Sequence, residues 1–386
     1  MSETNNLRDL AKQVNEIARS DVMKERRALW RRHNSFQGDR PLIYVRAFAV
    51  DEWFDKSTLK CEDPMLRGYE YQLRQTLWRS QLGDDYIVEP WLELGASYVM
   101  PNGERWGVPV SLGEKPVSGG AAAFRPVLLE EDFSCLRAAP YAVDEAKTAL
   151  RREKLEEALG GALPVFVSRQ GPYAMWSGDI STDLAKLRGL EQIMWDVYDN
   201  PEWLHSLLAF MRDGILQNHR DAEAAGGFSL ADHQNQCMPY AQELDDPDPA
   251  VTGVPRARLW RFLAAQEFTG FSPEMFWEFI LQYQQPILEG FGLTAYGCCE
   301  NLTDDIPYLR RIRNLRRIAV SPFANARKCA ELIGRDYILS WRPNPSLMLA
   351  TGLDEDLVRR HMREHFAIFK ENRSFFDITL KDVETV

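Results

Sequence analysis

The sequence has no long apolar segment. None of its hydrophobic runs approaches the roughly 20 residues that a membrane-spanning helix needs, and the N-terminal segment MSETNNLRDLAKQ has no apolar core of the kind found in signal peptides. We therefore expect a cytoplasmic protein that has no contact with a membrane. Cysteine is also scarce, with six in 386 residues. In the cytoplasm such cysteines do not form a disulfide framework, so we expect core residues, reactive thiols or metal ligands.

Several catalytic and binding motifs are absent. The sequence has no phosphate-binding glycine loop, no GxGxxG after a strand, no HExxH and no nucleophile elbow, which counts against nucleotide-dependent chemistry and serine hydrolysis. Excess positive charge is missing too, because the net charge is −11, and this argues against a nucleic-acid partner. The basic cluster RRIRNLRR (310–317) is interpreted as a solvated helix end and loop.

The residues that are present indicate a globular α/β protein, with 45% hydrophobic and 27% charged side chains. Short apolar runs recur along the chain, separated by segments that mostly have helical spacing. These runs cover residues 42–48, 86–94, 164–170, 228–234, 293–300, 318–323, 337–343 and 376–382. Near-continuous apolar runs that alternate with helices predict a parallel sheet covered on both faces. Eight such units predict a (β/α)8 TIM barrel.

The rest of the chain is predicted to surround this barrel. Residues 1–38 have helical periodicity and many charges, which predicts an N-terminal helical extension on a barrel of residues 39–386. Helices are expected to begin after Asn200 and after Ser272, where a capping residue precedes proline. The connection 95–163 is too long for a plain crossover, and its glycine- and proline-rich part predicts a β-hairpin insertion near the barrel mouth.

Polar residues crowd the ends of the predicted strands, where barrel enzymes carry their active sites. Each of them alone is as consistent with a structural role as with a functional one, but their convergence from different strands predicts a site. The candidates include Arg46, Glu89, Gln170, Asp232, His233, Glu300, Arg342, Asn344, Lys381, Asp382 and Glu384.

The stretch LTAYGCCENL (293–302) places two cysteines and a glutamate at a strand end. Strand alternation puts Cys299 on the inner face with Gly297 and turns Tyr296 towards the helices. Both thiols could equally be ordinary buried cysteines. A catalytic zinc would need three protein ligands and an open position. The candidate ligands are Cys298, Cys299, Glu300, His233, Cys237 and Glu384.

The order and spacing of several segments resemble the uroporphyrinogen decarboxylase superfamily from about residue 39 to the end. These segments are DRPLIYVRA, VFVSRQGPYAMW, DNPEWLHSLL, AAGGFSLAD, SPEMFWEFILQYQQPILEGF, AYGCCEN, IAVSPF and GRDYILSWRPNPSLM. In the zinc-dependent, corrinoid-linked methyltransferases of that superfamily, the strand that GCCEN resembles often reads His-x-Cys-Gly. Cys299 falls at the cysteine, and Gly297 replaces the histidine. True decarboxylases carry an arginine-rich segment after the first strand, of which RAFAV keeps only Arg46.

The resemblance implies a divergent member of the methyltransferase branch. The expected function is metal-assisted transfer of a methyl group between a small methylated substrate and a corrinoid carried by a partner protein, with zinc as Lewis acid. A homodimer is also possible. The expected metal ligands are Cys298, Cys299, Glu300 and Glu384, the expected catalytic residues are Glu300, Glu267, Lys381 and Asp382, and Gln266 and Tyr296 are added to the substrate-binding candidates.

Two other functions remain open at this stage. One is a metal-free lyase in which Arg46 and Arg342 hold a carboxylate while an acidic group protonates a carbanion-like centre. The other is a non-catalytic binding protein on the same fold, which would fit the missing histidine.

Overall fold

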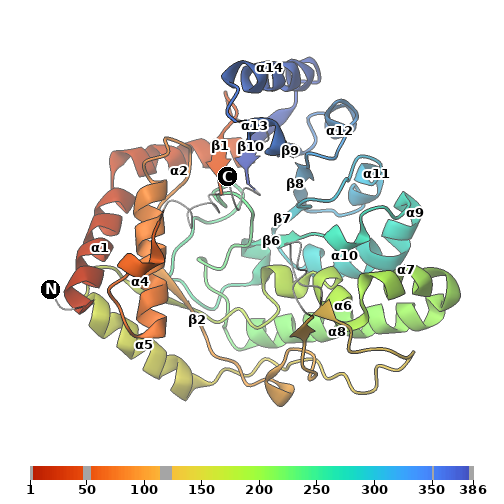
Figure 1. Ribbon diagram of the computed structural model, residues 1–386, viewed down its shortest axis with the longest axis horizontal. Helices are drawn as coiled ribbons and strands as arrows, with labels where there is room; N and C mark the ends of the chain where they lie inside the picture. The colour runs from red at the N-terminus through yellow and green to blue at the C-terminus, as the bar shows by residue number, and fades with distance from the viewer. Residues whose placement is uncertain (1–2, 47–53, 114–123, 350–351, 382–386) are drawn as a thin grey trace.

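The computed structural model describes residues 3–46, 54–113, 124–349 and 352–381. Its strands lie inside a surround of helices (Figure 1). A six-stranded parallel sheet runs in the order β1 (Ile43–Val45), β10 (Phe375–Leu380), β9 (Ile338–Trp341), β8 (Leu315–Val320), β7 (Leu293–Tyr296) and β6 (Trp260–Leu263). Strands β2 (Leu92–Gly95) and β5 (Val165–Ser168) form a separate parallel pair.

Helices cover the outside of the strands, and many of them begin at a side chain that caps the first turn, such as Asp63, Asp144 and Asp354. None of the described helices combines the length and apolar character needed to cross a bilayer. The helices are α1 (Glu3–Ala18), α2 (Asp21–Asn34), α4 (Pro64–Arg79), α5 (Glu145–Leu159), α6 (Ser181–Arg188), α7 (Leu190–Asp199), α8 (Pro201–Ala224), α9 (Pro273–Phe276), α10 (Gln282–Glu289), α11 (Ile306–Leu309), α12 (Ala326–Ile333), α13 (Ser346–Leu349) and α14 (Glu355–Glu371).

The prediction of an α/β fold with a parallel sheet is confirmed, and the sheet is curled (Figure 1). All but one of the predicted runs overlap a parallel strand. The exception, 228–234, was predicted wrongly: it is a turn, because Asp232 accepts a hydrogen bond from the backbone of Ser229 and so satisfies the chain locally. Strand β6 takes the place in the sheet that this run was expected to fill.

Single backbone hydrogen bonds, from Asp85 to Ile43 and from Gln234 to Trp260, together with side chains, connect the six-stranded sheet to the segments beside it. On one edge, Asp84 and Asp85 accept hydrogen bonds from the backbone N–H groups of Val45 and Ile43, both at 2.8 Å. On the other edge, the backbone N–H of Trp260 donates to His233 Nδ1 at 3.1 Å. Both edge strands therefore have their outer backbone groups partly satisfied.

The predicted helices and hairpin are also present. Helix α8 begins at Pro201, and α9 begins at Pro273 with Ser272 as its cap. The hairpin is the antiparallel pair β3 (Ser111–Leu112) and β4 (Phe124–Arg125), whose tip lies outside the described residues. The N-terminal extension is a pair of helices, α1 and α2, of which α1 packs on α4 and α5.

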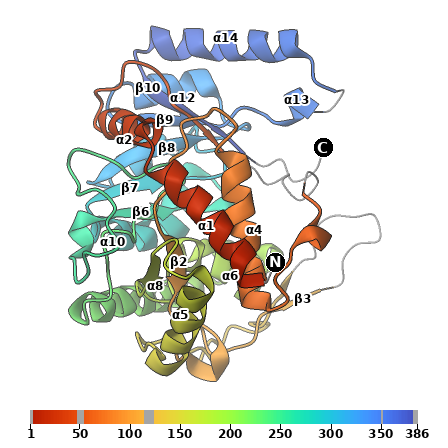
Figure 2. The same ribbon diagram turned by 90° about the vertical axis from the view of Figure 1, so that its left-hand side faces the viewer.

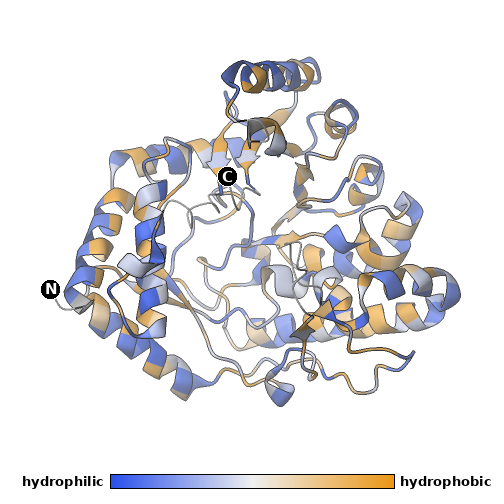
Figure 3. Ribbon diagram, viewed as in Figure 1, coloured by the Kyte–Doolittle hydropathy of each residue, from blue (hydrophilic) through white to orange (hydrophobic). Residues whose placement is uncertain are grey.

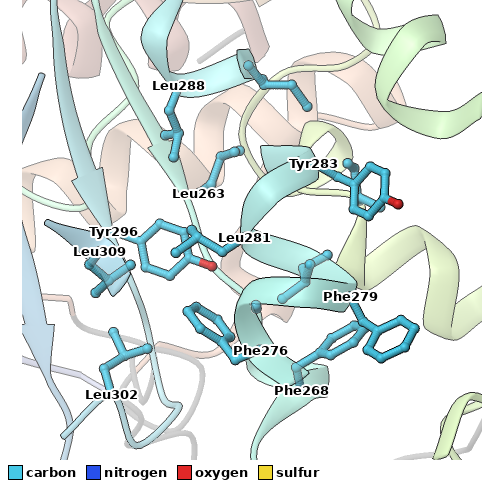
Figure 4. Packing of buried hydrophobic residues seen from close by; sticks show 14 of the residues in the cluster. Leu263, Phe268, Phe276, Phe279, Leu281, Tyr283, Leu288, Tyr296, Leu302 and Leu309 are labelled. Carbon is cyan, nitrogen blue, oxygen red and sulfur yellow. The ribbon is translucent and has the colours of Figure 1, made fainter. Parts of the chain in front are cut away.

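The main hydrophobic core lies between the sheet and the helices that follow β5 to β9. Tyr296 packs there with Phe276, Leu281 and Leu263 (Figure 4). The outer helices carry hydrophobic and hydrophilic residues side by side (Figure 3), which is typical of helices with one face on a core. Tyr296 is thus turned towards the helices, as predicted.

A buried ion pair joins three strands and the end of α2. Arg317 of β8 donates to Asp377 of β10 at 2.5 Å, and Ser340 of β9 donates to the same carboxylate at 2.9 Å. His33 of α2 contacts Asp377 at 3.1 Å. Arg317 is 2% exposed, so reading the whole basic cluster as solvated was wrong for this residue: it lies within β8 and faces an acid that is distant in sequence.

The protonation of Asp377 is set by these neighbours. Burial alone would raise its pKa, but the charge of Arg317 and the hydrogen bond with His33 outweigh burial and lower the pKa from 3.8 to about 2. A carboxylate whose pKa falls on folding contributes stability that is fully present above its unfolded pKa. This contribution is lost as the pH falls from about 4 towards 2.

We expect Asp377→Ala to destabilise the protein by about 3 to 5 kcal/mol, because it leaves the charge of Arg317 buried without its partner. Urea unfolding monitored by circular dichroism measures the loss. The matched control is the double variant Arg317→Met/Asp377→Ala, which removes both charges and should recover a large part of the loss. If the double variant loses as much stability as the single variants Asp377→Ala and Arg317→Met lose together, the two charges do not stabilise each other and this account is wrong.

Candidate functional site

Two thiols and an ammonium group meet beyond the ends of β7 and β10. Lys381, which follows β10, donates from Nζ to Cys298 Sγ at 2.8 Å and to Cys299 Sγ at 3.1 Å. The two sulfur atoms are 3.6 Å apart. Parallel strands bring their carboxyl ends to the same edge of a sheet, which is why residues 83 positions apart in sequence meet here.

Hydrogen bonding and charge favour one thiolate in this group. The hydrogen bond from Cys299 and, against the effect of burial, the positive charges of Arg342 and Lys381 lower the pKa of Cys298 to about 5. The same hydrogen bond, together with burial, raises the pKa of Cys299. Near neutral pH the pair therefore holds a single negative charge, placed on Cys298, and Cys299 keeps its proton. A thiolate is the nucleophilic and metal-binding form of cysteine.

The turn after β7 fixes the position of Cys298. Glu300 accepts a hydrogen bond from the backbone of Cys298 at 2.7 Å and another from the backbone of Ala265, after β6, at 2.9 Å. Gly297 has φ +95°, so the strand ends there and the alternation of faces does not continue into the cysteines. Cys299, predicted as the single inward thiol, is half-buried, and both it and the buried Cys298 lie against the cluster that contains Ala295.

Gly297 cannot be replaced without disturbing this turn. A Cβ atom at this position would overlap the side chain of Leu302 and lie 3.0 Å from Cβ of Ala319, in a region of φ that disfavours residues other than glycine. The histidine that the resemblance places at this position therefore does not fit the backbone of this chain.

Positive charge gathers at the carboxyl ends of three neighbouring strands. Arg342 follows β9, Lys381 follows β10 and Arg46 follows β1, and the backbone N–H of Arg46 donates to Leu380 of β10 at 2.7 Å. Arg342 is buried and donates to Gln236 Oε1 at 2.5 Å. Among the described residues, three cationic residues thus follow neighbouring strands at one edge of the sheet, and clustered positive charge of this kind favours the binding of anions.

A small internal cavity beside Arg342 has room for about one water molecule. Asn235, Gln236 and Arg342 line it, and each has a buried N–H donor, at Nδ2, Nε2 and Nε respectively, with no hydrogen-bond partner among the described residues. Buried donors normally have an acceptor. The wall of this cavity therefore favours a water molecule as acceptor.

The described residues do not provide a zinc site with three ligands. Over residues 3–46, 54–113, 124–349 and 352–381, no three His, Cys, Asp or Glu side chains gather closely enough to bind a metal ion. Glu300, expected as a ligand, instead accepts from two backbone groups. The expected residues Glu384 and Asp382 lie outside the described part of the chain. The possible metal ligands that do meet here are the two thiols, and both accept a hydrogen bond from Lys381.

Other predicted residues form a second polar group, at the end of β5. Asp232 accepts a hydrogen bond from Ser168 at 2.5 Å, and Gln170 donates to the same hydroxyl at 3.1 Å. Burial raises the pKa of Asp232 to about 7, although the hydrogen bond from Ser168 opposes this shift. Asp232 is thus a carboxyl group that can gain or lose a proton near neutral pH.

The remaining candidates lie apart from the thiols and have structural partners or positions. Glu267 accepts hydrogen bonds from Ser181 and Thr182, and Glu89 accepts them from Arg27 and Tyr240. His233 lies at the amino end of β6, where burial lowers its pKa to about 4. Tyr296 donates to Gln284 in the core, Asn344 accepts from the backbone of Ser346, and Gln266 starts the short 3-10 turn after β6.

Sequence reasoning missed Asn235 and Gln236 as site residues. Their segment NQC follows the run that was taken as a strand, and the sequence offers one signal: consecutive amide side chains before an apolar stretch. That pattern is also typical of surface loops, so burial was needed to identify these two residues as part of the cavity wall.

We expect a thiolate absorbance step near pH 5 at 240 nm, because the hydrogen bond from Cys299 and the charges of Arg342 and Lys381 stabilise the charged form of Cys298. A Cys298→Ser/Cys299→Ser variant provides the blank, and Lys381→Met should move the step upward by about one to three pH units. Cys135→Ser, which removes an exposed thiol, is the control and should leave the step unchanged. Absence of any step below pH 7 in the wild type would contradict the thiolate assignment.

We also expect Gly297→Ala to destabilise the protein by about 1 to 3 kcal/mol more than Gly270→Ala. Both glycines have φ +95°, but a Cβ at Gly270 would meet nothing within 4 Å. The comparison separates steric overlap from backbone strain. Urea unfolding measures the loss in free energy of unfolding for each variant. Equal losses would show that the contacts with Leu302 and Ala319 do not constrain the turn.

The chain matches no protein-family model, no curated protein and no solved structure. The features of the site that bear on its function are one thiolate, three cationic residues and a cavity wall of hydrogen-bond donors.

Proposed function

We propose that the protein is an enzyme that removes a carboxyl group from a small carboxylated substrate, that is, a lyase that needs no metal. The observation that carries the proposal is the gathering of Arg46, Lys381 and Arg342 at the ends of three neighbouring strands. Cationic side chains at a strand-end rim are suited to binding carboxylates.

We further propose that the six-stranded sheet and the pair β2 and β5 together form a barrel of the (β/α)8 type, whose rim is the site. The side-chain bridges from Asp84 and Asp85 to β1, and from His233 to β6, support this arrangement because they lie at the two edges of the sheet.

In the proposed reaction, Arg46 and Arg342 bind carboxylate groups of the substrate. The bond between the substrate carbon and the departing carboxyl carbon breaks, its electron pair remains on the substrate carbon, and carbon dioxide leaves. Lys381 then donates a proton to that carbon and regains one from water. Cys298 is a positioning residue: burial and Arg342 would lower the pKa of Lys381, but the thiolate outweighs them and raises it, which keeps the ammonium charged until the transfer.

Corrinoid-linked methyl transfer is the second candidate, favoured by one observation. Two adjacent thiols with a lowered pKa at Cys298 are in the form that binds a soft metal ion. A zinc ion there would activate the methylated substrate as a Lewis acid, and it would need a third ligand such as Glu384. A corrinoid protein would be the methyl acceptor or donor.

The test is a panel of small mono-, di- and tricarboxylic acids incubated with the enzyme in deuterium oxide. At least one acid should release carbon dioxide and give a product with deuterium at the decarboxylated carbon by NMR. Lys381→Met should lower kcat by about 100-fold or more, Arg46→Gln should mainly raise KM, and the exposed control Lys328→Met should behave as wild type.

The same preparations distinguish the two candidates. No carbon dioxide from any acid, together with stoichiometric zinc that disappears in Cys299→Ala, would overturn the lyase proposal in favour of methyl transfer. Wild-type protein that is active and free of zinc after dialysis against a chelator would support the lyase.

A further inference from the structure

A pocket among the described residues lies at the opposite end of β10 from the thiols. It has a volume of about 700 Å³, which is within the range typical of small-molecule sites. The loop after α2, the start of β10 and the last turns of α14 form its walls, and these elements lie together in Figure 2. Phe375 starts β10 and Lys381 follows its end, so the pocket and the thiols are about 20 Å apart along the strand.

The pocket combines aromatic walls with positive charge. Phe36, Phe366, Phe375 and Phe376 supply rings, and Phe36 and Phe375 pack edge to face with ring centroids 5.4 Å apart. The guanidinium of Arg335 lies over Phe375 at 4.9 Å from the ring centroid. Flat apolar surfaces beside cations suit an aromatic ligand that carries an acid group.

Three of the cations at this pocket are available to a ligand. Arg335, Lys370 and Arg373 are exposed, and none of them makes an ion pair with an acid in the part of the chain that the structure describes. In contrast, Arg40 at the same pocket is held by Asp85 at 2.7 Å. The lining also contains one acid, Asp39, which lies 3.9 Å from Arg32. In a chain of net charge −11, a lining with more cations than acids is a local reversal of charge.

Two further features of the wall are consistent with a binding role. Phe36 and Arg373 both have positive φ, 58° and 54°, at the ends of α2 and α14, where glycine is usual. Each non-glycine residue there costs about 1 kcal/mol of strain and places its side chain at the pocket. The hydroxyl of Ser374, also in the wall, is buried and has no partner among the described residues.

We propose that this pocket is a second binding site, separate from the strand-end site, for an anionic small molecule with a flat aromatic body. The ligand's rings would lie among Phe36, Phe366 and Phe376, and its carboxylate, sulfonate or phosphate group would be bound by Lys370 and Arg373, with Arg335 beside them. The hydroxyl of Ser374 would donate a hydrogen bond to the acid group.

The experiment uses the full chain and a matched pair of fluorescent probes. The anionic probe is 8-anilinonaphthalene-1-sulfonate, and the neutral probe is N-phenyl-1-naphthylamine, which has the same rings without the sulfonate. We expect the anionic probe to bind with one site per chain, at least about tenfold more tightly than the neutral probe. Its affinity should fall with added salt because the contributing charges are exposed.

Paired variants locate the site. Lys370→Gln/Arg373→Gln removes two charges at the pocket and should weaken sulfonate binding by about tenfold. Arg360→Gln/Arg363→Gln removes two exposed charges from the same helix, α14, away from the pocket lining, and should bind as wild type. Circular dichroism and urea unfolding confirm that both variants are folded.

Three results would each overturn the proposal: unchanged affinity in Lys370→Gln/Arg373→Gln, an equal loss in the control pair, or equal affinity for the two probes. Cys298→Ser should leave probe binding unchanged, so this test is independent of whether the strand-end site performs decarboxylation.

Discussion

The buried ion pair between Arg317 and Asp377 is the constraint on which much of the structure depends. Burying two opposite charges costs desolvation free energy. That cost is offset only if the two groups pair with each other and if their remaining donors and acceptors are also hydrogen-bonded. Here Ser340 and His33 complete the group, so three strands and α2 are held in one register. Helix α2 is for this reason part of the body of the protein, and the sheet has a polar centre.

The same cluster separates two sites of different character along β10. At the amino end, the pocket near Phe375 is open, aromatic and cationic. At the carboxyl end, Lys381 lies among thiols and arginines in a largely buried setting. Because low effective dielectric strengthens interactions between charges, the buried end is suited to shifting the pKa of a thiol and the exposed end to binding ions from solvent.

Much of the fold was predictable because it follows from local periodicity. Apolar runs marked most of the strands, and the pairs Asn200–Pro201 and Ser272–Pro273 marked helix starts. The strand β6 was missed because Arg261 interrupts its apolar run, and the partners that let an arginine be buried there, such as Gln234, lie outside the run. Tertiary pairing of this kind leaves no trace in a local pattern.

The candidate site was predictable in part. Residues at strand ends, such as Lys381 and Arg342, could be named from the predicted strands alone. The cysteine that carries the charge could not be predicted, because the alternation of faces stops at Gly297. The role of Glu300 as a backbone acceptor could not be predicted either, because it depends on the loop after β6.

The pairing of His33 with Asp377 also bears on how the chain folds during synthesis. These residues are 344 positions apart, and at about 5 to 20 residues per second a ribosome needs roughly 20 to 70 s to make the intervening chain. Until β10 emerges, Arg317 has no acid to meet, and the edge of β9 that β10 will cover is open to other chains. Contacts of such high sequence separation slow folding, so the pairing of β10 with β9 and with α2 is a late event in the life of the nascent chain.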